Sequence, residues 1–350
     1  MDPVMDPVLT RTVTKLSDGR ELIYYDETPG HDRSAADQRD LPTVSTTSQL
    51  RRDPLTGEFT TVAGHRQDRI FLPAADQCPL DPSRPPGRLT EIPAADYDVA
   101  VFENRFPSLA GDTGRCEVVV FSSDHGSSFG SLPVARIRSI VDVWADRTAE
   151  LGQRPGIEYV YCFENRGVEV GVTLHHPHGQ IYAFTYVPPR MRKMLEVATA
   201  YHGSTGGCVA CDALAEERAE AARVITSGRY FTAYVPYAGR WPFQVDIVPH
   251  RHVPDLPALT AAERDELAEI GKDCVGRLDG LFDGPMPYIG SWYQAPVGAG
   301  RAESHLRWQL AALRRAPGKL KHLAGTESGA GAFMNDIGPE RAAAMLRGEQ

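Results

Sequence analysis

Residues 171–182 read GVTLHHPHGQIY, and the interpretation of the rest of the chain starts from this stretch. It holds three of the eleven histidines, with apolar residues on both sides. That flanking pattern favours a buried strand over the alternative, a solvated polar loop. Residues two positions apart in a strand point to the same side, so we expect His176 and His178 to share one small site.

Length and charge limit the classes of protein to consider. A chain of 350 residues exceeds what one hydrophobic core usually holds, which favours two domains or a duplicated unit. The net charge of -9 argues against a nucleic-acid partner, but it allows a nucleotide substrate, because a pocket needs only a few arginines. No apolar run approaches the ~18 residues that cross a bilayer, and the N-terminus lacks a signal-peptide pattern. We therefore expect a cytoplasmic protein with no membrane partner.

The periodicity of apolar residues predicts the same series of elements twice. The first series consists of strands and one helix, at 97–103, 116–122, 132–152 (the helix) and 157–163. The second series has the same order, at 230–236, 243–248, 256–282 (the helix) and 287–292. Two helices, near 189–202 and 211–224, separate the series. Near the N-terminus, Leu22 and Tyr24 predict one edge strand, and a turn at 51–59 leads into another strand at 59–63.

Matching spacings support a duplication. The number of residues between Cys78 and His125 is nearly the same as the number between Cys208 and His252. The run 305–310 also aligns with 176–181. We therefore expect an α+β fold of two duplicated units, each an antiparallel sheet with helices packed on it. The predicted divisions are a partly disordered N-terminal extension at 1–44, a first repeat with the histidine motif at 45–200, and a second repeat at 201–350.

Aligning the repeats yields two candidate metal sites. Among the six cysteines, only Cys208 and Cys211 form a Cys-x-x-Cys pair, which in a cytosolic protein indicates metal or redox chemistry. The first set is Cys78, Asp81, His125 and His176; the second is Cys208, Cys211, His252 and His305. The second is a complete tetrahedral zinc quartet, and the carboxylate in the first also ligates zinc. We expect one or two zinc ions and no organic cofactor; the alternative is ordinary cysteine loops with core histidines.

The same alignment isolates a candidate nucleophile. His178 corresponds to Arg307 in the second repeat, so only the first repeat carries an imidazole that the metal sites do not use. Attack by imidazole on phosphorus would form a covalent intermediate, and its phosphoryl oxygens would need hydrogen-bond donors. Gln180 and Thr173 are polar residues within plausible reach.

Several motifs between about residue 45 and residue 347 resemble the galactose-1-phosphate uridylyltransferase family, a branch of the histidine triad superfamily. The most specific is HPHGQ at 176–180, and the supporting ones are FENRF at 102–106, FENRG at 163–167, WPF at 241–243 and KLKHLAGTE at 319–327. The resemblance implies histidine-triad-like units and a homodimer. It also implies double displacement: UDP-glucose uridylylates His178, glucose 1-phosphate leaves, and galactose 1-phosphate takes the UMP.

The resemblance assigns further roles by motif position. Gln180 binds the phosphoryl group of the intermediate. The residues implied to contact phosphates are Thr173, Asn165, Arg66 and Arg69, those implied to contact the nucleoside are Asn104 and Phe106, and those implied to hold the hexose are Lys321 and Glu327.

The sequence departs from the family pattern at several places. Asp81 replaces the usual cysteine, and Tyr293 and Arg307 replace histidines in a region where some members bind a second metal. A related ADP-glucose phosphorylase branch has a cysteine pair like the one here. Two alternatives therefore stay open: a sibling nucleotidyltransferase or phosphorylase that uses another sugar 1-phosphate or an ADP-sugar, and a catalytically impaired, zinc-stabilised nucleotide-binding protein.

Overall fold

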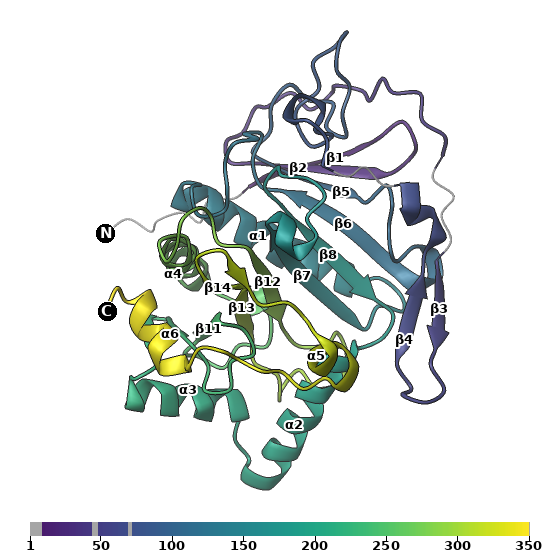
Figure 1. Cartoon of the computed structure of the whole chain (residues 1–350). Coiled ribbons are helices and arrows are strands. Elements are labelled where there is room, and N and C mark those ends of the chain that lie inside the picture. Colours follow the sequence, from purple (N-terminus) through teal and green to yellow (C-terminus); the bar gives the residue numbers. More distant parts are fainter. Residues whose placement is uncertain (1–8, 44–47, 69–71, 350) are drawn as a thin grey trace, which may run out of the picture. The chain divides into compact units, whose positions relative to one another are not determined.

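The computed structural model describes residues 9–43, 48–68 and 72–349, and the chain forms two compact units (Figure 1). Unit 1 consists of the chain up to Cys162 together with Thr173–Pro189, and unit 2 consists of Phe163–Val172 together with the chain from Arg190 onward. Strand β7 (Tyr159–Arg166) therefore gives its first half to unit 1 and its second half to unit 2.

Unit 1 is built on a run of strands that includes β8, which begins at His178 of the histidine motif, and its neighbour β6. The strands lie in the order β1 (Thr10–Lys15), β2 (Glu21–Asp26), β5 (Val99–Glu103), β6 (Gly114–Val120), β8 (His178–Phe184) and the start of β7 (Figure 1). Helix α1 (Val134–Gly152) packs on this sheet, and its buried Arg147 donates to both carboxylate oxygens of Glu117 on β6, at 2.9 Å each.

Short elements complete unit 1. A separate hairpin pairs β3 (Gln49–Arg52) with β4 (Phe59–Val62). Single 3-10 turns lie at Gly64–Asp68, Ala75–Gln77 and Gly111–Thr113.

Unit 2 is built on a run of antiparallel strands. From the end of β7 the strands lie in the order β12 (Tyr288–Tyr293), β13 (Arg307–Ala312), β11 (Phe243–Pro249), β10 (Phe231–Tyr234) and β9 (Val224–Ser227). The helices are α2 (Pro189–Thr205), α3 (Val209–Glu220), α4 (Ala261–Asp279), α5 (Gly325–Ala330) and α6 (Pro339–Leu346). Of these, α3 and α4 contact β10, and α6 contacts β9. A small hairpin pairs β14 (Arg314–Ala316) with β15 (Lys319–Leu320), and 3-10 turns lie at Val168–Val170 and Leu256–Ala258.

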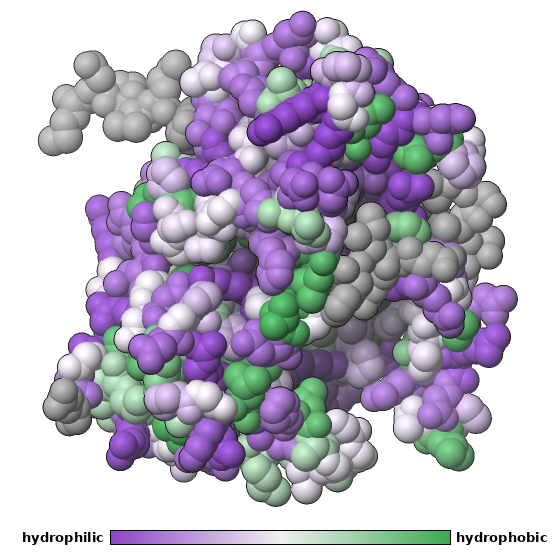
Figure 2. All heavy atoms as spheres, turned by 45° about the horizontal axis from the view of Figure 1, so that its top comes forward, coloured by the Kyte–Doolittle hydropathy of each residue, from purple (hydrophilic) through white to green (hydrophobic). Residues whose placement is uncertain are grey.

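The hydrophobic cores explain why these elements pack. The largest fully buried side chains include Trp144 on α1 and the stacked pair Trp292 and Trp308 on β12 and β13, with ring centroids 5.0 Å apart. The face of the molecule in Figure 2 is mostly hydrophilic, with hydrophobic residues interspersed among polar ones. Large buried side chains thus stabilise each unit from within. No helix among the described residues is long and apolar enough to cross a membrane.

The structure confirms the predicted fold class, an α+β architecture of antiparallel sheets with helices packed on them. The glutamine that both repeats share lies on a paired strand in each unit. Gln180 on β8 lies opposite Val118 on β6, and its counterpart Gln309 on β13 lies opposite Asp246 on β11.

Two details of the predicted elements were wrong. The N-terminal strand is not an edge strand, because β2 lies between β1 and β5, and four consecutive side chains from Leu22 to Tyr25 are at most 2% exposed. The predicted helix at 256–282 begins only at Ala261, because Thr260 forms a capping box with Glu263 that starts the helix there. The expectation of disorder at the extreme N-terminus falls on residues 1–8, outside the described residues.

Candidate active site and metal centres

His178 is the first residue of β8, and its environment selects one tautomer of the imidazole. Nδ1 lies 2.7 Å from the carbonyl oxygen of His176, and since a carbonyl only accepts, Nδ1 carries the proton. Within the described residues, Nε2 has no hydrogen-bond partner, so its lone pair is available. Burial lowers the pKa of His178, which keeps the ring neutral near pH 7. This is the protonation state that a nitrogen nucleophile needs.

His176 lies in the turn before β8 and is almost fully buried at 1% exposure. Its Nδ1 lies 2.8 Å from Asp81 Oδ1, and its Nε2 donates to the carbonyl of Ser122 at 2.7 Å. His178 adjoins His176 through the bond to its carbonyl, but the two rings have different partners, so their sharing of one small site stays a prediction. His176 belongs to a group of potential metal ligands that does not include His178.

That first group consists of Cys78, Asp81, His125 and His176, with one ligand atom of each lying within 4.8 Å of the others. Asp81 Oδ1 is 3.0 Å from His125 Nδ1 as well as 2.8 Å from His176 Nδ1. Because Nε2 of His176 donates to Ser122, its Nδ1 bears a lone pair that faces a carboxylate oxygen. A metal ion between these atoms would satisfy both of them, and the four ligand atoms lie close enough together to hold one, so the group fits a metal ion.

Arg88 is a neighbour of this group that the sequence did not reveal. It donates to Asp81 Oδ2 at 2.7 Å, on the side of the carboxylate away from the two histidines. Burial raises the pKa of Asp81, but its interactions with Arg88, His125 and His176 outweigh burial and lower the pKa overall. Asp81 is therefore a carboxylate at neutral pH. Tyr97, whose hydroxyl lies 3.1 Å from His176 Nε2, was also missed, because no local pattern links residues so far apart in sequence.

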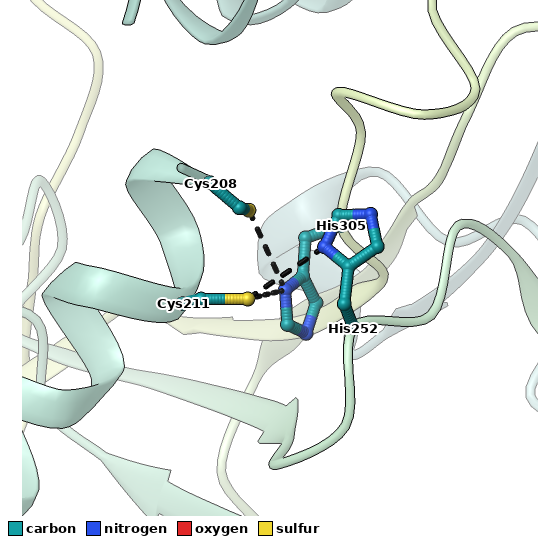
Figure 3. Close-up of side chains that lie close together, drawn as sticks. All are labelled: Cys208, Cys211, His252 and His305. Carbon is teal, nitrogen blue, oxygen red and sulfur yellow. Dashed lines mark hydrogen bonds between the residues drawn. The ribbon is translucent and has the colours of Figure 1, made fainter. Parts of the chain in front are cut away.

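The second group, Cys208, Cys211, His252 and His305, lies in unit 2 (Figure 3). Cys208 precedes α3 and Cys211 lies in its first turn, so the helix brings both sulfurs toward the histidines. Cys211 Sγ is 3.2 Å from His305 Nδ1 and 3.6 Å from His252 Nδ1, and Cys208 Sγ is 3.8 Å from His305 Nδ1. Tetrahedral zinc with ordinary bond lengths separates such ligand atoms by roughly 3.3–3.8 Å. The geometry fits a four-coordinate metal ion.

The protonation of His305 also suits a ligand. Its Nε2 donates to the carbonyl of Pro249 at 3.0 Å, which leaves the Nδ1 lone pair directed toward the sulfurs. Burial, with a smaller contribution from His252, lowers the pKa of His305 to about 4, so the ring is neutral. Both four-residue groups could therefore hold a metal.

The predicted substrate residues of unit 1 are partly linked by hydrogen bonds. Arg66 donates to the carbonyl of Phe106 at 2.6 Å, and the Asn104 side chain accepts from the amide of Phe106 at 2.8 Å. Thr173 accepts from Leu72 through its carbonyl at 2.8 Å, and Gln180 is partly exposed on β8. Arg69 lies outside the described residues.

In unit 2, Lys321 and Glu327 form a buried ion pair of 2.7 Å. The hydrogen bond from Lys321 lowers the pKa of Glu327 to about 2, so Glu327 is a carboxylate at neutral pH. Glu327 also accepts from the amide of Ala324 at 3.2 Å, which holds the start of α5. Asn165 lies on β7 opposite Ile289 of β12.

Comparisons with known proteins identify the family of this chain. Residues 109–188 match the N-terminal domain model, and residues 195–348 the C-terminal domain model, of galactose-1-phosphate uridyl transferase. A galactose-1-phosphate uridylyltransferase of Streptomyces lividans is 48% identical over 83% of this chain and 82% of its own length. One of Thermotoga maritima is 36% identical, covering 85% and 98%. A solved uridylyltransferase structure superposes with a TM-score of 0.78 at 31% identity, covering 86% of this chain and 98% of that one. The chain therefore belongs to the galactose-1-phosphate uridyl transferase family.

Proposed function

We propose that this chain moves UMP between UDP-glucose and galactose 1-phosphate through a covalent uridylyl group on His178. The observation that carries the proposal is the tautomer of His178, whose Nε2 lone pair is available while Nδ1 is bonded to the carbonyl of His176. The names of the relatives in Streptomyces lividans and Thermotoga maritima support the same reaction.

The first half-reaction follows from that tautomer. Nε2 of His178 attacks the α-phosphorus of UDP-glucose, the bond to the bridging oxygen breaks, and glucose 1-phosphate leaves with the bonding electron pair. The imidazole becomes cationic as the new P–N bond forms, and the carbonyl of His176 stabilises the proton on Nδ1. We assign Gln180 the role of donating its amide to the phosphoryl oxygens, where negative charge accumulates.

The second half-reaction reverses the first with a different sugar. A phosphate oxygen of galactose 1-phosphate attacks the uridylyl phosphorus, the P–N bond breaks, and His178 returns to its neutral state. We assign the remaining substrate contacts by position in the family motifs. The phosphate contacts are Arg66, Arg69, Thr173 and Asn165, the nucleoside contacts are Asn104 and Phe106, and the hexose contacts are Lys321 and Glu327.

We further propose that zinc binds both metal groups. Four protein ligands fill a tetrahedral site, so the ion would act structurally, by holding distant loops together. Cys78, Asp81, His125 and His176 would hold one ion beside the turn that carries His178. Cys208, Cys211, His252 and His305 would hold the other.

A homodimer, a cytoplasmic location and the division into 1–44, 45–200 and 201–350 are further parts of the proposal. All six cysteines are free thiols, which suits a reducing compartment. Light scattering on a size-exclusion column tests the dimer.

The decisive experiment uses UDP-glucose labelled in the uracil ring. Protein mixed with this substrate and then denatured should retain acid-labile, alkali-stable label, and peptide mapping should locate the label at His178. The labelled protein should release its label to galactose 1-phosphate. Label obtained only from ADP-glucose would favour the sibling nucleotidyltransferase or phosphorylase. No label from either sugar nucleotide would favour the impaired binding protein.

A further inference from the structure

Two arginines from separate elements of unit 2, Arg190 and Arg307, lie over one tyrosine. A third, Arg240, lies over a different ring, with its guanidinium carbon 4.7 Å from the ring centroid of Phe333. Arg307 is the first residue of β13, Arg190 lies in the first turn of α2, and Arg240 lies in the loop before β11. The guanidinium carbons of Arg307 and Arg190 lie 4.8 Å and 5.2 Å from the ring centroid of Tyr293. Burial and the positive charges of Arg190 and Arg307 lower the pKa of Arg240. The three cations therefore share one electrostatic neighbourhood.

Only one carboxylate balances these charges. Asp246, which is fully buried, accepts from Arg307 at 2.9 Å through Oδ2. Its other oxygen is already occupied, because Oδ1 accepts from the amides of Gln309 and Gln244. Across residues 9–43, 48–68 and 72–349, neither Arg190 nor Arg240 forms an ion pair. The cluster thus carries an excess of two positive charges.

The cluster is also open to a ligand. The Arg307 side chain is 25% exposed, Arg190 is partly exposed and Arg240 is exposed. In the part of the chain that the structure describes, Nε of Arg307 has no hydrogen-bond acceptor. Gathered guanidinium groups repel one another unless an anion lies among them, and their planar forks match the oxygens of a phosphate group.

The alignment of the two repeats also gives Arg307 a distinctive position. It stands where the first repeat has His178, two residues before the glutamine that both repeats share. The second repeat thus has cations at the place where the first has its candidate nucleophile. An arginine is no nucleophile, because its guanidinium stays protonated, so this place is suited to holding a phosphate rather than reacting with it.

We propose that Arg190, Arg240 and Arg307 form a binding site for a phosphate group in the second repeat. Tyr293 orients two of the guanidinium planes by cation–π contact, and Asp246 anchors Arg307 from the buried side. The ligand is inorganic phosphate or the phosphate group of a sugar phosphate or nucleotide. The site involves no covalent step, and it does not depend on the reaction proposed for His178.

The test compares thermal unfolding of the full chain in phosphate and in chloride at equal ionic strength. The informative variant is the double substitution Arg190→Gln and Arg240→Gln, because neither residue has a carboxylate partner whose charge would be left unpaired. Arg307→Gln is less suitable, since it would leave Asp246 buried without its cation. Arg315→Gln is the matched control, because Arg315 is exposed and pairs with Asp336 elsewhere in unit 2.

Phosphate should raise the Tm of the parent and of the Arg315→Gln control, and the double variant should lose that rise. Calorimetric titration with inorganic phosphate, a sugar 1-phosphate and UMP should show binding weakened about tenfold or more in the double variant, and the relative affinities identify the natural source of the phosphate. A parent without any rise in Tm overturns the proposal, as does a double variant that keeps the full rise. Labelling of His178 in the double variant, measured separately, should persist, so failure here is distinguishable from failure of the proposed function.

Discussion

His176 and His305 have the same relationship to the backbone of their repeats. Each donates from Nε2 to a carbonyl that lies three residues before another histidine of its metal group, Ser122 before His125 and Pro249 before His252. Each therefore presents Nδ1 as a ligand atom. This contact orients the ring and fixes the tautomer before any metal binds, which lowers the cost of assembling the site.

Replacement of the candidate nucleophile should abolish transfer without unfolding the chain. In the His178→Ala variant no proposed metal ligand is lost, so we expect the Tm to change little and activity to fall more than about a hundredfold, as covalent catalysis is worth several kcal/mol. Steady-state assays and thermal melts check both parts. His175→Ala is the control, because His175 is the exposed neighbouring histidine. Residual activity above about a hundredth of the parent's would contradict the role of His178.

Loss of one sulfur should reveal the second metal group. Cys208→Ser should lower both the zinc content and the Tm, because a hydroxyl is a poor substitute for a thiolate ligand. Atomic absorption on the purified protein measures the metal. Cys274→Ser serves as control, since Cys274 is a buried thiol of α4 outside both groups. Its Tm should fall with full zinc retained, and equal zinc in the Cys208 variant would refute the site.

The first metal group should tighten when its carboxylate is replaced by a thiolate. Asp81→Cys restores the residue usual in the family and supplies the softer ligand that zinc prefers. We expect slower loss of zinc to a chelator than in the parent. Asp81→Ala is the comparison, and it should lose this ion. If all three proteins release zinc at one rate, Asp81 is not a ligand.

Glu164 should make stability fall as the pH rises toward neutrality. Burial raises the pKa of this carboxyl from 4.5 to about 7, against a hydrogen bond from Tyr288 that lowers it. The native state holds the proton more tightly than the unfolded state, so its contribution is complete below about pH 4.5 and is lost as the pH rises through 7. The loss is at most about 3 kcal/mol.

Glu164→Gln should remove that pH dependence, because an amide keeps an acceptor for the Tyr288 hydroxyl but does not ionise. Denaturant unfolding between pH 4.5 and pH 8 measures the difference from the parent. The control, Glu158→Gln, changes an exposed carboxyl and should follow the parent's curve. Parallel curves for the parent and Glu164→Gln would show that Glu164 is ionised in the native state throughout.

The amino-acid sequence predicted the fold class, the order of the main strands and helices, and the two four-residue groups that could hold a metal. These could be predicted because apolar periodicity is local and the duplication placed Cys78 and Cys208, or His125 and His252, at matching intervals. Element boundaries were less accurate, as at α4, where the capping residues rather than the apolar pattern decide the start.

The hydrogen-bond and ion-pair partners of these side chains became known only from the tertiary structure. It bonded His178 to the carbonyl of His176, paired Arg88 with Asp81, and put buried Asp246 beneath Arg307. The physical reason is that strand register and loop closure bring these groups together across tens of residues. Hydrogen-bond and ion-pair partners at that separation depend on the whole packed unit, and no local pattern of sequence encodes them.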